Sequence, residues 1–477
     1  MKMIINGETV NSSDGQVLKI INPATGELID TVPAATKEDI NTAVAAAKSG
    51  QKIWAKVPVY EKVEIMKKFI GLVLENKEDL ARTLSDETGK PIKEARAEIG
   101  NIPIAFDAFC EKAKHLYGSV VPAGLEAGQD KNILFTQREP IGVVACIIPF
   151  NFPCDLYDQK VAPALLSGNA AIIKPSTDNP LTLCKLTKLM AVSGVTPGAI
   201  EIVTGRGSTV GSWLCSNPDV HLVTLTGSTE VGIETARACA ENLTHVALEL
   251  GGNDAFIVLD DADIDLAADE LIWGRMYNTG QVCCASKRFL VHKSIASEFA
   301  KKAVEKISKL KLGMPSDETS ELGCLISERA AIKVEDQVNL TASQGGKIIL
   351  GGNRKGAFYD PTVIVDVPKT ADVSTDMEIF GPVVPIIPFD TIEEAIEIAN
   401  SSKFGLCGCV FTKDIKKAFC VANALECGGS VINGASFFRS FEMPFGGYKF
   451  SGIGTEGVMS TFNEMTRTKS IVLKNIL

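Results

Sequence analysis

The chain has 477 residues, 45 % hydrophobic and 22 % charged, which is typical of a globular protein and long enough for two or three domains. Its 58 acidic and 48 basic residues give a net charge of −10, which argues against nucleic acid or an anionic membrane as the main partner. Thirteen cysteines contain no C-x-x-C pair and are accompanied by four histidines, which argues against a disulfide framework or a zinc site.

Short strands and turns are predicted for the first 35 residues, followed by three helices. Thr36 and Asp39 form a capping-box pattern, which predicts a helix over 36–50. Two longer helices are predicted over 60–87 and 91–116, because charged and apolar residues there lie on opposite faces.

From residue 141 onward, apolar runs alternate with helical stretches, which predicts parallel sheets with right-handed crossovers. The first block has predicted strands at 141–148, 170–174, 199–203, 220–225 and 246–250, and helices at 156–167, 180–193, 208–216 and 229–241. The second block has predicted strands at 255–259, 287–292, 362–366, 383–388, 406–411 and 430–432, and helices at 264–277, 294–310, 391–401 and 414–425. A last strand, 466–473, has little local partner and fits equally an edge strand of its own chain or pairing with another subunit.

The sequence Asn278-Thr279-Gly280-Gln281-Val282-Cys283 contains a candidate nucleophile. A cysteine after a Gly-Gln turn can face backbone N–H groups, which favour the reactive thiolate. A structural thiol is an equal alternative on these residues alone. Cys284 adjoins it, but two consecutive side chains cannot face one pocket, and the spacing of the motif selects Cys283.

Two further side chains are suited to catalysis. Glu249 lies between two leucines at the end of a predicted buried strand, where burial would raise its pKa and suit it to general base catalysis. An ion-paired or exposed glutamate is the alternative, and the following pair Gly251-Gly252 favours close backbone approach beside the carboxylate. Asn151 lies between Pro149-Phe150 and Phe152-Pro153 and can donate a hydrogen bond to an oxyanion, although a turn asparagine is the simpler interpretation.

Three stretches after predicted strands are suited to binding a nucleotide. Lys174-Pro175-Ser176-Thr177 can meet ribose or phosphate, and the helix that begins after Gly227-Ser228 can accept a phosphate at its N-terminus. Gly205-x-Gly207 is another glycine turn. The G-x-G-x-x-G dinucleotide fingerprint is absent from these stretches.

Together and in this order, the motifs resemble those of the aldehyde dehydrogenase superfamily along essentially the whole chain. The resemblance is carried by Pro149–Pro153, Lys160–Asn169, Lys174–Ser176, Thr226–Gly232, Glu249–Gly252, Asn278–Cys283, Glu378–Pro382 and Pro444–Gly452.

The resemblance implies a hydrolytic, NAD(P)-dependent oxidation of an aldehyde to the carboxylic acid. Cys283 would add to the aldehyde, Asn151 and the Cys283 N–H would bind the oxyanion, and Glu249 would activate water against the thioester. Lys160 and Glu456 match positions that relay protons in the family.

For the cofactor, the resemblance implies binding by Lys174, Ser176, Thr177, Gly205, Gly227, Ser228, Glu378 and Phe380. Lys174 would contact the adenosine ribose, Ser228 the pyrophosphate and Glu378 the nicotinamide ribose, while Phe380 would support the ring. Thr177 stands where NAD-preferring members usually carry a glutamate, so we expect NADP to be accepted and preferred over NAD.

For the substrate, Gln159 and Val282 occupy positions at which some members carry a cationic anion reader. A phosphate tail is therefore not expected. The segment Phe437–Pro444 resembles the lactaldehyde dehydrogenase-like subgroup, which has non-phosphorylating glyceraldehyde-3-phosphate and semialdehyde relatives. Arg439 in this segment would read a polar or anionic tail, or is a surface-loop arginine. Lactaldehyde is the expected substrate, and succinate semialdehyde and glyceraldehyde 3-phosphate are the alternatives.

The fold implied is α/β, with two Rossmann-like parallel-sheet domains and a small β oligomerisation arm. The expected divisions are 1–118 with 141–250 for the dinucleotide, 251–455 for catalysis, and 119–140 with 456–477 for the arm of a homodimer or homotetramer. No apolar run approaches a spanning helix, and the N-terminus lacks a secretory core, so we expect a cytoplasmic protein without membrane or metal.

Three other functions compete with this one. A CoA-acylating semialdehyde dehydrogenase lacks the general-base glutamate, which is present here as Glu249. A catalytically silent structural or binding member of the same fold would have lost its nucleophile, and Cys283 is retained. Without the family, His245 four residues before Glu249 would suggest a Cys-His hydrolase, although such a histidine is more often part of the packing.

Overall fold

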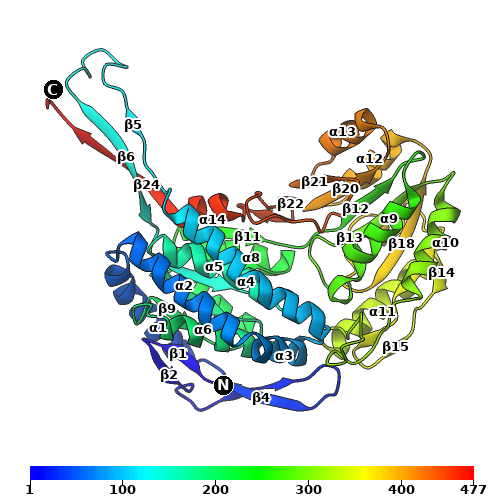
Figure 1. The fold of residues 1–477 in the computed structure, drawn as a ribbon, viewed down its shortest axis with the longest axis horizontal. Helices are drawn as coiled ribbons and strands as arrows, with labels where there is room; N and C mark the ends of the chain where they lie inside the picture. The colour runs from blue at the N-terminus through cyan, green and yellow to red at the C-terminus, as the bar shows by residue number, and fades with distance from the viewer. Residues whose placement is uncertain (477) are drawn as a thin grey trace.

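The computed structural model of the protein describes residues 1–476 and contains two helix-covered sheets and a projecting arm (Figure 1). These are the two parallel-sheet bodies and the β arm predicted from the sequence. Within residues 1–476 no helix is both long and apolar enough to cross a membrane. In the same residues, no three or more His, Cys, Asp and Glu side chains are grouped so that they could hold a metal ion.

The first sheet has the strand order β2-β1-β9-β8-β7-β10-β11-β23 in the described chain. Its five central strands are parallel, and antiparallel strands flank them at both edges. The strands are β1 (Met3–Ile5), β2 (Glu8–Val10), β7 (Val143–Ile147), β8 (Ala170–Lys174), β9 (Ile200–Ile202), β10 (Leu222–Thr226), β11 (His245–Glu249) and β23 (Gly452–Ile453). The five strands predicted in the first block are thus confirmed as β7 to β11.

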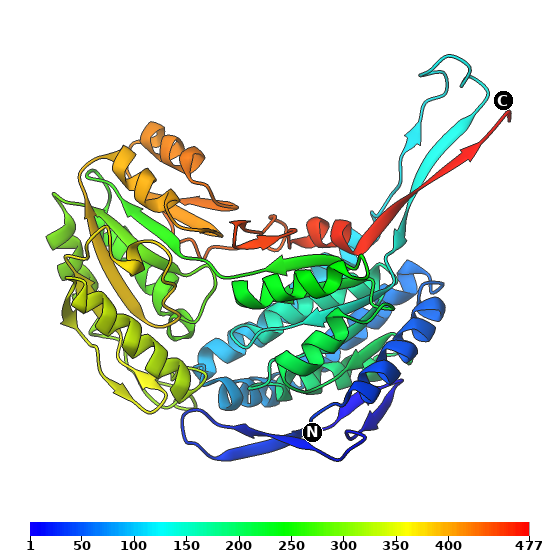
Figure 2. The same cartoon turned by 180° about the vertical axis from the view of Figure 1, so that it is seen from behind.

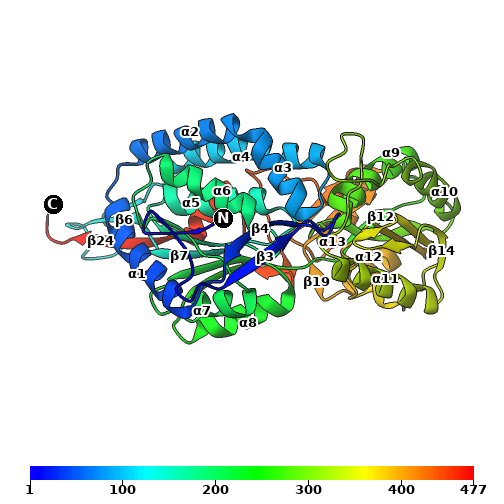
Figure 3. The ribbon, with the colours of Figure 1, turned by 90° about the horizontal axis from the view of Figure 1, so that it is seen from below.

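Helices cover both faces of this sheet (Figure 3). One face carries α2 (Val59–Glu75), α3 (Lys77–Thr88), α4 (Ile92–Ala113), α5 (Pro153–Leu166) and α6 (Leu181–Val192), and the other carries α1 (Lys37–Trp54), α7 (Ser212–Cys215) and α8 (Thr229–Ala240). Alternate residues of the buried strands enter separate cores on the two sides, as the two-residue period of a strand requires.

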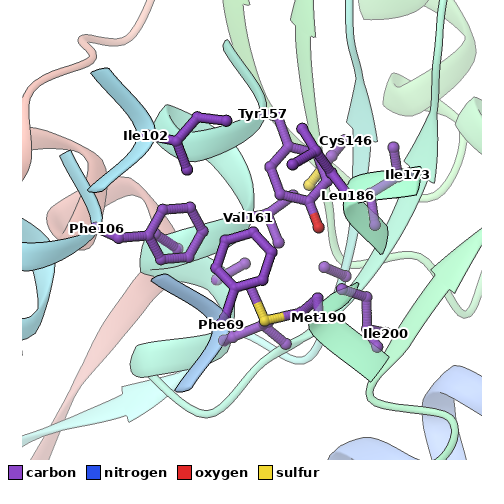
Figure 4. Close-up of a cluster of buried hydrophobic side chains, with 14 of the residues drawn as sticks. Phe69, Ile102, Phe106, Cys146, Tyr157, Val161, Ile173, Leu186, Met190 and Ile200 are labelled. Atoms are coloured by element: carbon purple, nitrogen blue, oxygen red, sulfur yellow. The ribbon is translucent and has the colours of Figure 1, made fainter. Parts of the chain in front are cut away.

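The core under α5 fixes the helix that carries several of the predicted site residues (Figure 4). Phe69 of α2 and Phe106 of α4 lie 4.8 Å apart between ring centroids, and Tyr157 of α5 packs against the same cluster. Tyr157 is fully buried, and so is Val161 one turn later. Aromatic burial of this extent anchors α5 against the strands.

The second sheet has the order β14-β17-β18-β13-β12-β20-β21 and is parallel except for β14. Its strands are β12 (Asp254–Val258), β13 (Ser286–His292), β14 (Lys347–Leu350), β17 (Thr362–Val365), β18 (Val383–Phe389), β20 (Cys407–Phe411) and β21 (Gly429–Ile432). The helices around it are α9 (Ile264–Leu271), α10 (Ala296–Ile307), α11 (Glu328–Ser343), α12 (Ile392–Asn400) and α13 (Ile415–Ala424). All six strands predicted in this block are present.

The arm is a three-stranded antiparallel sheet that extends away from both bodies (Figures 1 and 2). It consists of β5 (Val120–Val121), β6 (Ile133–Pro140) and β24 (Thr466–Leu473), and α14 (Val458–Met465) leads into it. The last strand has the predicted bounds and pairs along its full length with β6 of its own chain. Smaller two-stranded sheets are β3 (Val17–Ile21) with β4 (Leu28–Pro33), β15 (Arg354–Lys355) with β16 (Phe358–Tyr359), and β19 (Phe404–Gly405) with β22 (Tyr448–Lys449).

Three helix predictions differ from the structure. The helix predicted over 208–216 begins with a π-helical turn at Gly207–Gly211 and is α-helical only over Ser212–Cys215. The helix predicted over 60–87 is interrupted at Asn76, whose side-chain amide donates to the carbonyl of Leu72 and ends α2. The helix predicted over 264–277 is α-helical only to Leu271, because a π-helical turn and a left-handed turn follow it and lead to the Cys283 loop. The capping box at Thr36 and Asp39 is confirmed.

Candidate active site

The carboxyl ends of four parallel strands bring the predicted motifs of the first sheet together. Asn151 follows β7, Lys174 ends β8, Ser228 follows β10 and Glu249 ends β11. Strands β10 and β11 are paired in register, as are β7 and β8, so these residues share one edge of the sheet. Ligands of open α/β sheets bind at this edge.

Cys283 reaches the same edge from the second sheet, in the loop before β13. The turn before it holds Asn278 and Thr279 at positive φ of 50° and 54°, a left-handed conformation that costs energy outside glycine. Only glycine fits at the next position, Gly280, because a Cβ there would lie 2.3 Å from the carbonyl oxygen of Gly381. After this tight turn Cys283 is partly exposed and packs, as Phe152 does, against an apolar cluster that contains the buried Cys284.

The pKa of the Cys283 thiol is lowered to about 7. The Cys284 thiol donates a hydrogen bond to it, and the positive charges of Lys287 and Arg439 favour the thiolate further, against the opposing effect of burial. Lys287 is buried, donates to the Cys283 carbonyl and forms an ion pair with Glu378 at 3.2 Å. The choice of Cys283 over Cys284 agrees with this asymmetry, since the pKa of Cys284 is raised well above its usual value.

This pKa predicts the pH dependence of alkylation of Cys283 by iodoacetamide. Below pH 7 the thiol keeps its proton, so the rate should fall about tenfold per pH unit, and it should level off above about pH 8. Peptide mass spectrometry measures the rate at Cys283 and at the exposed Cys420 in the same sample. A midpoint at the ordinary cysteine value of about 8.5 would contradict the environment described here.

Asn151 is held by its backbone carbonyl, which accepts hydrogen bonds from Lys90 Nζ and Asn278 Nδ2, both at 2.9 Å. Lys90 is 1 % exposed and forms a buried ion pair with Glu98 of α4. Glu94, one turn earlier on α4, accepts from the Asn278 N–H at 2.9 Å. Sequence reasoning missed these supporting residues, although two glutamates spaced i, i+4 on an apolar helix face were a signal for buried partners.

Glu249 is 5 % exposed, and one of its carboxylate oxygens has no hydrogen-bond partner within residues 1–476. Burial raises its pKa well above the usual range, and the nearby negative charges of Glu456 and of the Cys283 thiolate raise it further. The predicted nucleophile and the predicted general base therefore lie close enough for their charges to interact, although they belong to different sheets.

Glu456 lies between two cations. Its carboxylate accepts from Lys160 Nζ at 2.6 Å and from Arg439 at 2.9 Å. Burial alone would raise the pKa of Glu456, but the two positive charges and their hydrogen bonds lower it to about 2. Arg439 also lies 4.1 Å over the ring of Phe445, so it is built into the site and is not a surface-loop arginine.

The other two predicted substrate residues, Val282 and Gln159, are both uncharged. Val282 is buried in the apolar cluster around Cys284, and Gln159 is 1 % exposed with neither amide atom hydrogen-bonded within the described chain. His245 is exposed at the opposite end of β11 from Glu249, which removes the Cys-His hydrolase alternative.

The residues predicted to bind the nucleotide lie at the carboxyl ends of β8 and β10 and in the loops that follow these strands. Lys174 is buried, burial lowers its pKa to about 8, and a Cβ on Gly207 would lie 3.8 Å from its Nζ. Ser228 caps α8, whose first-turn N–H groups point toward the strand ends and can bind a phosphate. Thr177 Oγ1 donates to the Gly205 carbonyl at 3.3 Å, and Ser176 is partly exposed beside it.

At the other end, the loop of Glu378 and Phe380 faces the strand edge. Gly252 N–H donates to Glu378 at 3.3 Å, and a Cβ on Gly251 would lie 2.6 Å from the same carboxylate. Phe380 packs edge-to-face against Phe150 with centroids 5.9 Å apart. Gly227, one residue before Ser228, has its N–H bonded to the Glu249 carbonyl and links the cofactor and catalytic motifs.

Residues 9–471 match the family model described as the aldehyde dehydrogenase family. The chain belongs to the aldehyde dehydrogenase family. Membership implies oxidation of an aldehyde with a pyridine nucleotide as cofactor, and the fold predicted from the motifs is confirmed.

Curated proteins and solved structures that are similar to this chain include lactaldehyde-type dehydrogenases and an NADP-dependent enzyme. The chain is 40 % identical to a 3-sulfolactaldehyde dehydrogenase of Priestia aryabhattai, with 87 % of this chain and 86 % of the relative covered. It is 39 % identical to a lactaldehyde dehydrogenase of Methanococcus vannielii, with 84 % and 86 % covered. Among solved structures, an NADP-dependent enzyme of E. coli superposes with a TM-score of 0.96 at 35 % identity, with 99 % of this chain and 98 % of that chain covered.

Proposed function

We propose that this aldehyde dehydrogenase oxidises a small polar aldehyde to its carboxylic acid through a thioester on Cys283. The observation that carries the proposal is the meeting of a thiol of lowered pKa with the buried carboxylate of Glu249, close enough that the thiolate raises the pKa of that carboxyl group. Asn151, fixed through its carbonyl, completes the site.

In the first step the Cys283 thiolate attacks the aldehyde carbon, and the carbonyl oxygen becomes an oxyanion. The side-chain amide of Asn151 and the Cys283 N–H donate hydrogen bonds to it. The resulting thiohemiacetal collapses to the thioester by releasing hydride. A bound nicotinamide dinucleotide supplies the hydride acceptor. Glu249 then takes a proton from a water molecule that attacks the thioester, and Cys283 leaves as the thiolate.

The charges around Glu249 change during the reaction, and this change determines when Glu249 can act as a base. Burial is the main cause of the raised pKa of Glu249, and the charge of the Cys283 thiolate raises that pKa further. Forming the thioester removes that charge, so Glu249 ionises more readily at the step that needs a base. The cations Lys160 and Arg439, which pair with Glu456, favour the ionised form of Glu249. We propose that Lys160 and Glu456 relay its proton.

For the substrate we propose a small aldehyde that is neutral or singly charged, with lactaldehyde as the first candidate. The names of the relatives, lactaldehyde and 3-sulfolactaldehyde dehydrogenase, support this choice. Gln159 and Val282 offer no cation, which leaves Arg439, already paired with Glu456, for an anionic group. Initial rates with lactaldehyde, 3-sulfolactaldehyde, succinate semialdehyde, glyceraldehyde 3-phosphate and alkanals test the proposal. A kcat/KM for glyceraldehyde 3-phosphate a hundredfold above that for lactaldehyde would overturn it.

For the cofactor we propose NADP in preference to NAD. A glutamate at position 177 would repel the extra phosphate of NADP, by about 4 kcal/mol per unit charge at 4 Å and an effective dielectric of 20. Thr177 removes that repulsion and adds a hydroxyl, and Lys174 three residues earlier adds a positive charge. Asp178 is the opposing group, since its exposed carboxylate lies close enough to Lys174 to raise that lysine's pKa against the effect of burial.

The Thr177→Glu variant should move the ratio of kcat/KM for NADP over NAD toward NAD by tenfold or more. The Asp178→Asn variant is the matched control and should move the ratio toward NADP, because it removes a negative charge near the same phosphate. Both ratios are measured with one good aldehyde. A tenfold preference of the unmodified enzyme for NAD, or no change in Thr177→Glu, would show that the residue does not select the cofactor.

We further propose that the arm assembles the protein into a homodimer or a dimer of dimers. Val120 is 77 % exposed, and Val472 on β24 is half exposed although it lies in a sheet. Exposed apolar strands of this kind pair with or pack on another subunit. Light scattering at micromolar concentration should give two or four times the monomer mass, and a monodisperse monomer would refute the proposal.

A further inference from the structure

Lys287, the second residue of β13, is a buried lysine to which the mechanism above gives no role. Its side chain is 1 % exposed. The ammonium group donates a hydrogen bond to the backbone carbonyl of Cys283 and forms an ion pair with Glu378, whose Oε1 lies 3.2 Å from Nζ. A buried charge is retained only where acceptors and an opposite charge surround it, so these two contacts determine where the ammonium group lies.

The first contact holds the backbone of the nucleophile. Lys287 follows Cys283 by four residues and closes the loop between them onto the Cys283 carbonyl. Gly252 leaves the space for this contact, because a Cβ there would lie 2.9 Å from the Cys283 carbonyl oxygen and 2.9 Å from Asp254 Oδ1. Burial raises the pKa of the Asp254 carboxyl group to about 7, and the nearby charge of Lys287 opposes that rise. The peptide group next to the reacting sulfur is thus held by the ammonium group of one side chain.

The second contact anchors one oxygen of the Glu378 carboxylate and leaves the other open. Oε1 pairs with Lys287 and accepts from the Gly252 N–H at 3.3 Å. Oε2 lies over Gly251, where a Cβ would approach it to 2.6 Å, and it accepts no hydrogen bond within residues 1–476. The side chain is 21 % exposed. An anchored carboxylate with one open oxygen can accept from a hydroxyl group, which is the role expected of Glu378 toward the nicotinamide ribose.

The charges around the Cys283 thiol oppose one another. The hydrogen bond from the Cys284 thiol is the main cause of the lowered pKa of Cys283, and burial opposes it. Lys287 and Arg439 lower this pKa further, whereas Glu378 raises it. Removing the charge of Lys287 should therefore make the thiol less acidic, and removing the charge of Glu378 should make it more acidic.

We propose that Lys287 is a positioning residue that connects the nucleophile to the cofactor site, because its ammonium group holds the Cys283 carbonyl and the anchored oxygen of Glu378 at the same time. This inference rests on the proposed function and extends it to a residue between the two sites. Loss of Lys287 should change the reactivity of Cys283 and the affinity for the dinucleotide together. A lysine that only supports the fold would shift neither in a defined direction.

The first measurement is the pH dependence of Cys283 alkylation by iodoacetamide in the protein without cofactor. Lys287→Met should raise the midpoint by about one pH unit, because a positive charge near the thiolate is lost. Glu378→Gln should lower the midpoint, and Lys287→Arg, which keeps the charge, should stay closer to the unmodified protein than Lys287→Met. Lys293→Met, at a 72 % exposed position just after β13, is the matched control and should leave the midpoint unchanged. An unchanged midpoint in Lys287→Met, or shifts of the same sign in Lys287→Met and Glu378→Gln, would refute the proposal.

The second measurement is a fluorescence titration with NADP or NAD, whichever binds the unmodified protein more tightly. Lys287→Met should weaken binding about fivefold, and Glu378→Gln should weaken it at least as much. If Lys287 acts through Glu378, the double variant should bind within about twofold of Glu378→Gln alone, because the effects of residues that share one interaction do not add. Losses that add in the double variant, or unchanged binding in Lys287→Met, would overturn the connection to the cofactor site.

A second variant covers the case in which Lys287→Met does not fold, as judged by its thermal transition. Lys287→Gln, whose amide can keep the hydrogen bond to the Cys283 carbonyl, then replaces it in both measurements, and the same signs are expected. Neither measurement needs an aldehyde, so a negative result in both leaves the proposed function standing. An enzyme that binds the dinucleotide but oxidises no aldehyde would refute the proposed function, and this inference with it.

Discussion

Replacing Cys283 by alanine is expected to lower kcat/KM for aldehyde oxidation by at least about 10⁴-fold while leaving NADP binding unchanged within about twofold. No thiohemiacetal can form without the sulfur, and without it the aldehyde has no route to release hydride. The groups proposed to hold the cofactor, such as Lys174 and Ser228, lie on the first sheet and do not depend on the thiol. Fluorescence titration measures binding, and the rate of cofactor reduction measures turnover.

Cys284→Ala is the matched control. Its thiol donates a hydrogen bond to Cys283, so its loss should raise the pKa of the nucleophile and lower activity at pH 7 less than tenfold. Raising the pH should recover that loss, which would not happen if Cys284 were itself the nucleophile. An inactive Cys284 variant together with an active Cys283 variant would reverse the assignment.

Replacing Glu249 by glutamine is expected to stall the enzyme after hydride transfer. The steps up to the thioester need the thiolate and the oxyanion donors, whereas hydrolysis needs a base within reach of the thioester. One equivalent of reduced cofactor per active site should therefore appear rapidly, followed by a steady state about 10²- to 10³-fold slower than that of the unmodified enzyme. Stopped-flow absorbance resolves the two phases.

The control for Glu249→Gln is Glu201→Gln, which neutralises another fully buried carboxylate. Glu201 accepts from the N–H of Asn6 and lies in the interior of the first sheet on β9. It should lose stability without showing a burst. Steady-state turnover of Glu249→Gln equal to that of the unmodified enzyme would remove Glu249 from the mechanism.

The strands could be predicted from the sequence because buried parallel strands are continuous apolar runs bounded by turn residues. All eleven strands predicted after residue 141 are present, and 466–473 has the bounds of β24. Helix ends were less predictable, since they depend on tertiary partners. Helix α11 (Glu328–Ser343) was not predicted, because most of its residues are polar and its apolar residues form only a short stripe. The break at Asn76 depends on one side-chain hydrogen bond.

The same distinction holds for the site. Cys283, Glu249 and Asn151 lie in short motifs that can be read directly from the sequence. The contacts around them join segments far apart in the sequence: Lys90 holds the Asn151 carbonyl, and Arg439 pairs with Glu456. No local pattern contains such pairings, so the sequence left Arg439 open between a substrate reader and a surface residue, and only the fold shows its carboxylate partner.

The central claim is a covalent acyl enzyme on Cys283, and mass spectrometry of the Glu249→Gln variant tests it most directly. The variant is mixed with lactaldehyde and NADP, quenched in acid after the burst, digested and fragmented. We predict one acyl group per subunit, on Cys283, in the same amount as the NADPH formed. Repeating the experiment in a Glu249→Gln, Cys284→Ala background should leave the adduct in place. Cofactor reduction without an adduct, or an adduct on another cysteine, would contradict the mechanism.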